Sequence, residues 1–184
     1  MAVNTAPHHL PGVAGDGTTR RLQALREPRC YPHAVRQVEI METHISWVLL
    51  TGNYAYKIKK PVNLGFLDFT PLKARHHYCD EEVRLNRRLA PDLYLGTVAI
   101  TGTPDAPQVG GAGTAFEYAV KMRQFPQGAL LDAALARGKV GVPQFEALAR
   151  KIAHFHAALP PLPGSVTRPE EAVLLDDLTP GQPR

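Results

Sequence analysis

Two lysines and one glutamate are the residues of this sequence whose types and spacing could do chemistry. Residues 47–62 place apolar and β-favouring side chains on both sides of Gly52-Asn53, a pattern that predicts two strands joined by a tight turn. Side chains alternate between the faces of a strand, so Lys57 and Lys59 share one face of the second strand. Two cations on one face could bind phosphate. The alternative is a solvated strand face, or an edge strand guarded by lysine.

The glutamate lies on the helix that follows. Thr70-Pro71 predicts a helix start, with Thr70 as the cap, and the helix should run to about residue 89, where Ala90-Pro91 ends it. On a helical wheel Glu82 falls near the middle of the apolar arc. A carboxylate that faces the core is costly unless it meets a cation, so the pattern predicts an ion pair with a lysine of the neighbouring strand. The alternative is a Glu82 side chain that turns to solvent.

The other elements must position these three residues. Residues 38–45, 93–101 and 116–123 read as further strands, and the Gly- and Pro-rich segment after residue 101 predicts a flexible hairpin connection. A short helix is expected over residues 20–26, and two more over 129–138 and 142–160. The last of these carries an apolar stripe that is interpreted as core. The sequence therefore predicts an α+β fold with an antiparallel sheet of about five strands and one packed helix.

Composition limits the classes of function. The chain has 184 residues, a formal net charge of +4 and a pI near 9.2, a mild basic excess that fits anionic small ligands or weak nucleic-acid contact. It has no signal-peptide pattern and no apolar run of membrane-spanning length, so a cytoplasmic protein without membrane contact is expected. Cys30 and Cys79 are too few and too far apart to predict a disulfide framework or a zinc site. His154 and His156 face different directions on their helix, so no metal site is expected there.

The order of these elements and the amino-acid sequence itself resemble those of a known family. Strand, strand, lysine strand, helix with inward glutamate, two strands and a connector into helices is the layout of the small lobe of the protein-kinase-like fold. Residues 41–102, METHISWVLLTGNYAYKIKKPVNLGFLDFTPLKARHHYCDEEVRLNRRLAPDLYLGTVAITG, resemble bacterial proteins with an aminoglycoside-phosphotransferase-like kinase domain, often followed by a P-loop ATPase or kinase domain. The ending IAHFHAALP resembles the helix that precedes the catalytic loop in such phosphotransferases.

The resemblance implies a role for each matching residue. Lys57 would bind the α- and β-phosphates of ATP, with Lys59 as the alternative, and Glu82 would hold that lysine in place. Thr43 and Ser46 occupy the turn where kinases have a glycine-rich phosphate cover. No glycine stands there, so their hydroxyls would have to contribute. Gln124 and Phe125 fall in the hinge segment, residues 123–126, whose backbone would hydrogen-bond adenine.

The resemblance also shows what the chain lacks. Phosphoryl transfer needs an Asp that orients the acceptor hydroxyl, and an Asn and a second Asp that hold Mg²⁺. No His-x-Asp-x-x-x-x-Asn pattern occurs, and Asp176 and Asp177 are interpreted as solvated. The resemblance therefore implies ATP and Mg as cofactors and a small hydroxylated acceptor, but no catalytic or metal-binding residue in this chain. We expect a truncated product or fragment, with weak nucleotide binding and no transfer.

The expected organisation has four parts: a disordered lead-in (1–19), the kinase-like small lobe (20–126), the start of a helical large lobe (127–160) and a Pro-rich tail (161–184). Two non-catalytic functions compete with the kinase interpretation. One is a basic binding module in which Arg84, Arg87 and Arg88 contact nucleic acid or an acidic partner, although the exposed aromatic residues that base stacking needs are not evident. The other is a degenerate lobe that only regulates a partner.

Overall fold

A computed structural model gives the fold of the chain and describes residues 16–160. The expectations for residues 1–15 and for the tail 161–184, including Asp176 and Asp177, lie outside this range. The chain forms two units that divide after Leu130, and each is described by itself. The first unit holds all of the candidate site residues.

The first unit is built on a six-stranded antiparallel sheet with the order β1-β2-β3-β6-β4-β5. The lysine strand β3 lies between β2 and β6, so it is a central strand and the edge-strand alternative is wrong. The sheet and the helix that packs on it establish the predicted α+β class. The strands are β1 (Glu39–Glu42), β2 (Ser46–Leu50), β3 (Tyr54–Lys59), β4 (Tyr94–Thr103), β5 (Ala106–Val109) and β6 (Glu117–Arg123).

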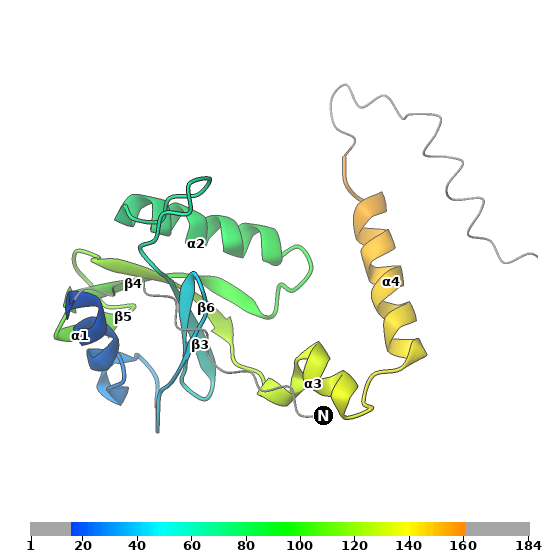
Figure 1. The fold of residues 1–184 in the computed structure, drawn as a ribbon, viewed down its shortest axis with the longest axis horizontal. Helices are drawn as coiled ribbons and strands as arrows, with labels where there is room; N and C mark the ends of the chain where they lie inside the picture. Colours follow the sequence, from blue (N-terminus) through cyan, green and yellow to red (C-terminus); the bar gives the residue numbers. More distant parts are fainter. Residues whose placement is uncertain (1–15, 161–184) are drawn as a thin grey trace, which may run out of the picture. The chain divides into compact units, whose positions relative to one another are not determined.

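Helices cover both faces of the sheet (Figure 1). Helix α2 (Leu72–Asn86) packs Cys79 and Val83 against Val120 of β6 on one face. The segment of helix α1 (Asp16–Ala24) and the 3-10 helix η1 (Pro28–Cys30) covers the other face and forms the larger core. The buried members of this core include Leu25, Tyr31, Trp47, Leu49, Tyr56, Ile58, Ile100 and Ala119.

The predicted turn of the lysine hairpin is confirmed. Gly52 has a φ of +94°, which is the left-handed conformation that glycine adopts without steric cost. Thr51 closes the turn, because its N–H and its hydroxyl both donate to the carbonyl of Tyr54, at 2.9 and 2.6 Å. This closure fixes the register of β2 and β3, and with it the face on which the lysines lie.

Two local expectations were wrong. The Gly- and Pro-rich segment contains an additional strand, β5, which brings the total to six. β5 is an edge strand that pairs with β4 only, so Pro107 removes no hydrogen bond on the side of β5 that has no neighbouring strand. Thr70 does not cap α2. Its N–H and hydroxyl donate to the Asp68 carboxylate instead, at 2.8 and 2.7 Å, and Pro71 is the residue that precedes the helix. The helix therefore starts two residues after Thr70.

Helix α1 begins at Asp16, four residues earlier than expected, so the predicted lead-in of residues 1–19 is too long. The helix and the turn after it place Leu25 in the core, where it is fully buried. The Tyr31 hydroxyl donates to the Leu25 carbonyl at 2.7 Å and holds the segment back against the sheet. The N-terminal segment is therefore a structural layer of the first unit.

The second unit contains α3 (Leu131–Ala136) and α4 (Val142–Ala157), and the 3-10 helix η2 (Gln127–Ala129) precedes them. Neither α3 nor α4 buries a side chain. The apolar stripe of α4 was interpreted as core, but Phe145, Leu148 and Ile152 are exposed. Periodicity predicted the helix correctly and did not predict what covers it. Within residues 16–160, no helix is long and apolar enough to cross a membrane.

Replacement of Leu25 by alanine should destabilise the first unit by about 2 to 5 kcal/mol, because it opens a cavity beneath α1. Urea denaturation, followed by the fluorescence of Trp47, measures this change. Leu85→Ala on α2 is the matched control, since Leu85 is 46% exposed and its loss should change stability by less than about 0.5 kcal/mol. Equal effects of the two substitutions would contradict the assignment of Leu25 to the core.

Candidate functional site

The predicted ion pair is present, and it involves both lysines. The Nζ of Lys57 donates to Oε1 of Glu82 at 2.8 Å, and the Nζ of Lys59 donates to Oε2 at 2.7 Å. Strand β3 supplies the two lysines two residues apart on one face, and α2 lies over that face with Glu82 turned inward. The expectation that Glu82 meets a strand lysine is confirmed, and the alternative of a solvent-facing Glu82 is wrong. Binding of phosphate by this cluster stays a prediction.

The cluster has an excess of positive charge. Burial alone would raise the pKa of the Glu82 carboxyl, but the hydrogen bonds and charges of Lys57 and Lys59 outweigh burial and lower that pKa. Glu82 is therefore ionised at neutral pH and balances only one of the two ammonium groups. The three side chains together carry one net positive charge in a half-buried position. Such a cluster can attract an anion.

The two lysines differ in their access to solvent. The Lys57 side chain is 28% exposed, whereas that of Lys59 is 6% exposed. The Lys59 ammonium also lies over the ring of Phe69, a cation–π contact with 5.3 Å from Nζ to the ring centroid. The Lys57 ammonium is therefore accessible to a ligand from solvent. The Lys59 ammonium is enclosed by Glu82 and Phe69.

Helix α2 places Glu82 through apolar contacts on either side of it. Cys79 and Val83 pack on Val120, which stands opposite Lys57 in the β3–β6 register. Cys79 is fully buried, and burial raises the pKa of its thiol to about 12. The thiol is therefore protonated at neutral pH and serves as packing. Cys30 and Cys79 are both free.

Thr43 and Ser46 close the turn between β1 and β2. The Thr43 hydroxyl donates to the carbonyl of Ser46 and accepts the N–H of Ser46, each at 3.0 Å. Ser46 is fully buried, and its Oγ has no hydrogen-bond partner. The Ser46 hydroxyl cannot reach a ligand in this conformation, so the phosphate contact expected of it has no support in the geometry. Both residues instead fix the turn beside the end of β3, where Ser46 faces Lys59.

Gln124 connects the end of β6 to the lysine hairpin. Its main-chain N–H donates to the carbonyl of Asn53 at 3.0 Å, and its side-chain Oε1 accepts the N–H of Gly52 at 2.8 Å. The N–H of Gln124 is therefore committed to the turn. Phe125, the other predicted hinge residue, has an exposed side chain.

A second buried carboxylate was missed by the sequence analysis. Glu117 is 1% exposed and accepts two hydrogen bonds from Arg75, Nε to Oε1 at 2.9 Å and Nη2 to Oε2 at 3.0 Å. Arg21 of α1 donates from Nη1 to Oε2 at 3.0 Å. Arg75 also donates to the carbonyls of Phe69 and Thr70 at 2.9 and 2.7 Å. These contacts join α1, α2 and β6 at one point.

The helical wheel contained the signal for Arg75. Arg75 precedes Glu82 by seven residues, which is about two turns, so the two side chains lie on the same stripe of α2. A cation in the middle of an apolar arc requires a buried partner for the same reason as a carboxylate does. Glu117 itself carried no such signal, because it is the first residue of a strand, where a charged side chain is common.

The three arginines of the nucleic-acid alternative have partners inside the chain. Arg84 forms a two-point ion pair with Glu81, at 2.9 and 2.7 Å. Arg87 donates to the carbonyls of Tyr94 and Leu95. Arg88 also has an interaction partner within the chain. These contacts reduce the number of cations that this side of α2 offers to a partner.

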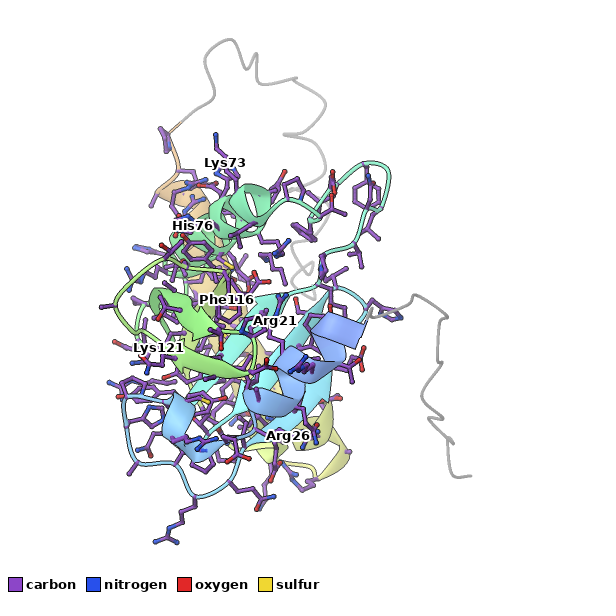
Figure 2. The ribbon with its side chains drawn as sticks, turned by 90° about the vertical axis from the view of Figure 1, so that its left-hand side faces the viewer. Arg21, Arg26, Lys73, His76, Phe116 and Lys121 are labelled. Carbon is purple, nitrogen blue, oxygen red and sulfur yellow. The ribbon has the colours of Figure 1, made fainter. Side chains whose placement is uncertain are left out.

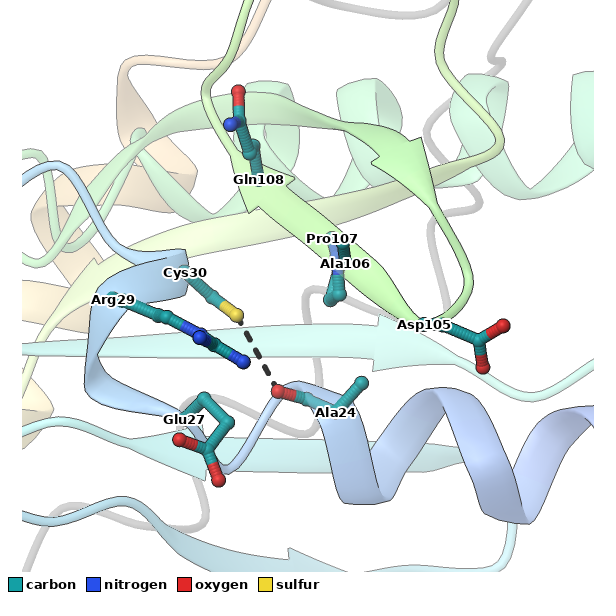
Figure 3. Close-up of a pocket in the computed structure, with 8 residues that line it drawn as sticks. All are labelled: Ala24, Glu27, Arg29, Cys30, Asp105, Ala106, Pro107 and Gln108. Atoms are coloured by element: carbon teal, nitrogen blue, oxygen red, sulfur yellow. Dashed lines mark hydrogen bonds between the residues drawn. The ribbon is translucent and has the colours of Figure 1, made fainter.

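Two hollows of the first unit lie away from the predicted site residues. A cavity of about 110 Å³ separates η1 from β5, and Cys30 donates from its Sγ to the carbonyl of Ala24 beside it (Figure 3). An open hollow of about 590 Å³ lies between residues 65–68 and the first turns of α2, with Lys73 and His77 on its helical side. Within the part of the chain that the structure describes, no three His, Cys, Asp or Glu side chains gather as a metal site would require.

Replacement of Glu82 by glutamine should destabilise the first unit at neutral pH by about 2 to 3 kcal/mol, because the buried Lys59 and the half-buried Lys57 lose their counterion. The folded-state pKa of Glu82 lies below its ordinary value of 4.5. The stabilisation is therefore complete above about pH 4.5 and is lost as the pH falls through the folded-state pKa. Urea denaturation at pH 7 and at pH 3 should show a large difference from wild type at pH 7 and a much smaller one at pH 3.

Glu39→Gln, at an exposed position of β1, is the control and should change stability little at either pH. A Glu82→Gln penalty that stays constant between pH 7 and pH 3 would show that the carboxylate charge is not what stabilises the cluster.

The chain is similar to mycobacterial proteins of much greater length. Uncharacterized protein Rv2004c of Mycobacterium tuberculosis and uncharacterized protein Mb2027c of Mycobacterium bovis are each 33% identical to it over 130 residues, 69% of this chain and 24% of theirs. The chain thus spans about a quarter of the length of these relatives. No protein-family model matches the chain. No solved structure matches it significantly either.

Proposed function

We propose that this chain is the ATP-binding small lobe of a phosphotransferase similar to the aminoglycoside phosphotransferases. The observation that carries the proposal is the cluster of Lys57, Lys59 and Glu82, in which a helix glutamate meets lysines of a central strand. Kinases of this fold use a strand lysine, held by a helix glutamate, to bind the α- and β-phosphates. The net positive charge of the cluster favours a phosphate over a neutral ligand.

The geometry favours Lys57 as the phosphate ligand and Lys59 as the permanent partner of Glu82. Lys57 is the more exposed of the two, and Lys59 is held by both Glu82 and the ring of Phe69. When Lys57 turns toward a phosphate, Glu82 keeps one counterion. The carboxylate then stays neutralised and in place, and the lysine need not divide its donors between two anions.

Other contacts of the proposed nucleotide site would fall to main-chain groups. The N–H of Gln124 is occupied by Asn53, so a main-chain contact with adenine would fall to the carbonyl of Gln124 or to Phe125. In the β1–β2 turn Ser46 is buried and the N–H groups of Thr43 and Ser46 are bonded within the turn, so a phosphate contact there would fall to the remaining main-chain groups. Between residues 16 and 160 no cluster of His, Cys, Asp or Glu side chains offers a magnesium site, so no step is assigned to the metal here.

Phosphoryl transfer itself belongs to the whole protein in this proposal. The sequence has no catalytic-loop pattern, and the relatives are about four times as long as the part that aligns. The acceptor is expected to be a small hydroxylated molecule, and a downstream P-loop domain is the partner that the family resemblance suggests.

The chain should bind ATP weakly, and Lys57→Ala should weaken that binding about tenfold or more, because a charge-assisted hydrogen bond to phosphate is lost. Isothermal titration calorimetry of the 184-residue chain with ATP, with and without Mg²⁺, measures the affinity. Lys60→Ala is the matched control. Lys60 lies on the opposite face, where its ammonium contacts Glu42 and the ring of Trp47, so its loss should leave the affinity unchanged.

Equal loss of affinity in Lys57→Ala and Lys60→Ala would exclude the assigned phosphate site. Lys59→Ala should chiefly lower stability, since it removes the enclosed counterion of Glu82. Robust phosphorylation of any small alcohol by this chain alone would contradict the assignment of catalysis to residues outside it.

The non-catalytic alternative, a basic module that binds nucleic acid, makes a different prediction. Binding to random-sequence DNA would weaken steeply with salt, because each neutralised phosphate releases counterions. We expect no such binding at 150 mM salt, since Arg84 and Arg87 are engaged within the chain. Fluorescence anisotropy across a salt series tests this, and a steep slope together with no response to ATP would favour the alternative.

A further inference from the structure

We infer that Arg21, Glu117 and Arg75 form a positioning network through which the N-terminal helix α1 sets the place of α2, and with it the place of Glu82 beside Lys57. The consequence for nucleotide binding rests on the proposed function, whereas the mechanical coupling does not. Arg21 is thereby a positioning residue for the candidate phosphate site, although it contacts neither lysine.

Glu117 occupies a point that both layers of the fold can reach. Strand β3 pairs with β6 only as far as Ile58 and Ala119, so beyond Ala119 the sheet is open on that side of β6. Tyr118 stacks on His76 of α2, with ring centroids 3.7 Å apart and planes within 6°. Side chains alternate along a strand, so the Glu117 side chain leaves β6 on the face opposite to Tyr118. This is the face that α1 covers. Arg75 reaches it from α2 and Arg21 from α1.

The contacts of Arg21 tie α1 to this point and not merely to the surface. Its guanidinium lies over the ring of Phe116 at 5.4 Å, and its side chain is 25% exposed (Figure 2). Its Nε is buried without a partner, so the contact from Nη1 to Glu117 is the bond that compensates its charge. By contrast, the neighbouring Arg20 pairs with Asp105 at the surface, and both of these side chains are more than half exposed.

Helix α2 transmits the position of Arg75 to Glu82. The two residues lie on one stripe, about 10 Å apart along the axis, within a continuous helix of 15 residues. The first turns of α2 are held by Arg75 on Glu117 and by His76 on Tyr118, and the later turns by Cys79, Val83 and Glu82. A shift at the first pair therefore moves the Glu82 carboxylate relative to the lysines of β3.

Of the three residues in the network, Arg21 is the one that can be substituted without loss of the buried ion pair. Glu117 is buried and Glu82 is half-buried, and each carboxylate is shared by two cations. Loss of Glu117 would leave two facing guanidinium groups without a counterion, which would destabilise the unit strongly and obscure any coupling. Loss of Arg21 leaves the two-point Arg75–Glu117 pair and the packing of Leu25 in place, and removes only the charged contact from α1 to Glu117. The network thus offers a variant that keeps the fold and changes the coupling.

The test compares Arg21→Gln with Arg20→Gln in the full 184-residue chain. Hydrogen exchange without nucleotide should be faster at the α2 amides of residues 76–86 in Arg21→Gln and unchanged in Arg20→Gln. ATP affinity, measured by calorimetry, should fall roughly 2- to 30-fold in Arg21→Gln, the range by which residues of such networks alter coupling. Arg21→Lys, which restores a cation at this place, should recover part of both effects.

A purely structural role for Arg21 would lower global stability without these local changes, so urea denaturation is measured on every variant. Unchanged α2 exchange together with an ATP affinity within twofold of wild type overturns the inference. Failure of the wild-type chain to bind ATP would contradict the proposed function but not the coupling. The exchange experiment would still decide whether α1 and α2 are coupled. Should Arg21→Gln prove unfolded, Arg21→Lys alone decides: it must show intermediate α2 exchange, and wild-type exchange overturns the inference.

Discussion

The first unit depends on two carboxylates, the buried Glu117 and the half-buried Glu82, that are each shared by two cations. Glu117 and Glu82 hold α2 against the sheet at two places, the first through Arg75 and Arg21 and the second through Lys57 and Lys59. Cys79 and Val83 are the buried apolar side chains of the helix, and they pack on Val120 of β6. Its orientation is therefore fixed by this apolar packing together with hydrogen bonds and charge contacts, which are directional where hydrophobic contact is not.

This design has a consequence for the candidate site. A helix held by apolar packing alone could rotate or slide by fractions of a turn at small cost, whereas a two-point guanidinium–carboxylate contact permits one geometry. Arg75 on Glu117 supplies that contact. Glu82 then reaches both lysines at hydrogen-bond distance. The partial burial of the lysine cluster also limits the access of water, so its net positive charge acts at a lower dielectric than it would at the surface.

The two units differ in how complete they are as folding units. The sheet of the first unit has cores on both faces, and its N-terminal segment closes the larger of them around Leu25 and Tyr31. In the second unit, α3 and α4 bury no side chain, and the apolar stripe of α4 is exposed. We therefore expect the stability of the chain to reside in the sheet and its two covering layers. The relatives, of which the chain spans about a quarter, supply further sequence in which partners for that stripe can be sought.

The sequence by itself determined the elements with strong local signals. The Gly52 turn, the period of the strands and the inward place of Glu82 on α2 all follow from short-range sterics and from the cost of burying a charge. Strand β5 escaped prediction because its Pro107 is permitted only by its edge position, and the start of α2 was misplaced because Asp68 takes the hydroxyl of Thr70. Only the tertiary structure decided that Arg21, Arg75 and Glu117 meet. Arg21 and Glu117 are separated by 96 residues, and a contact of that kind is set by how layers stack, which no local pattern encodes.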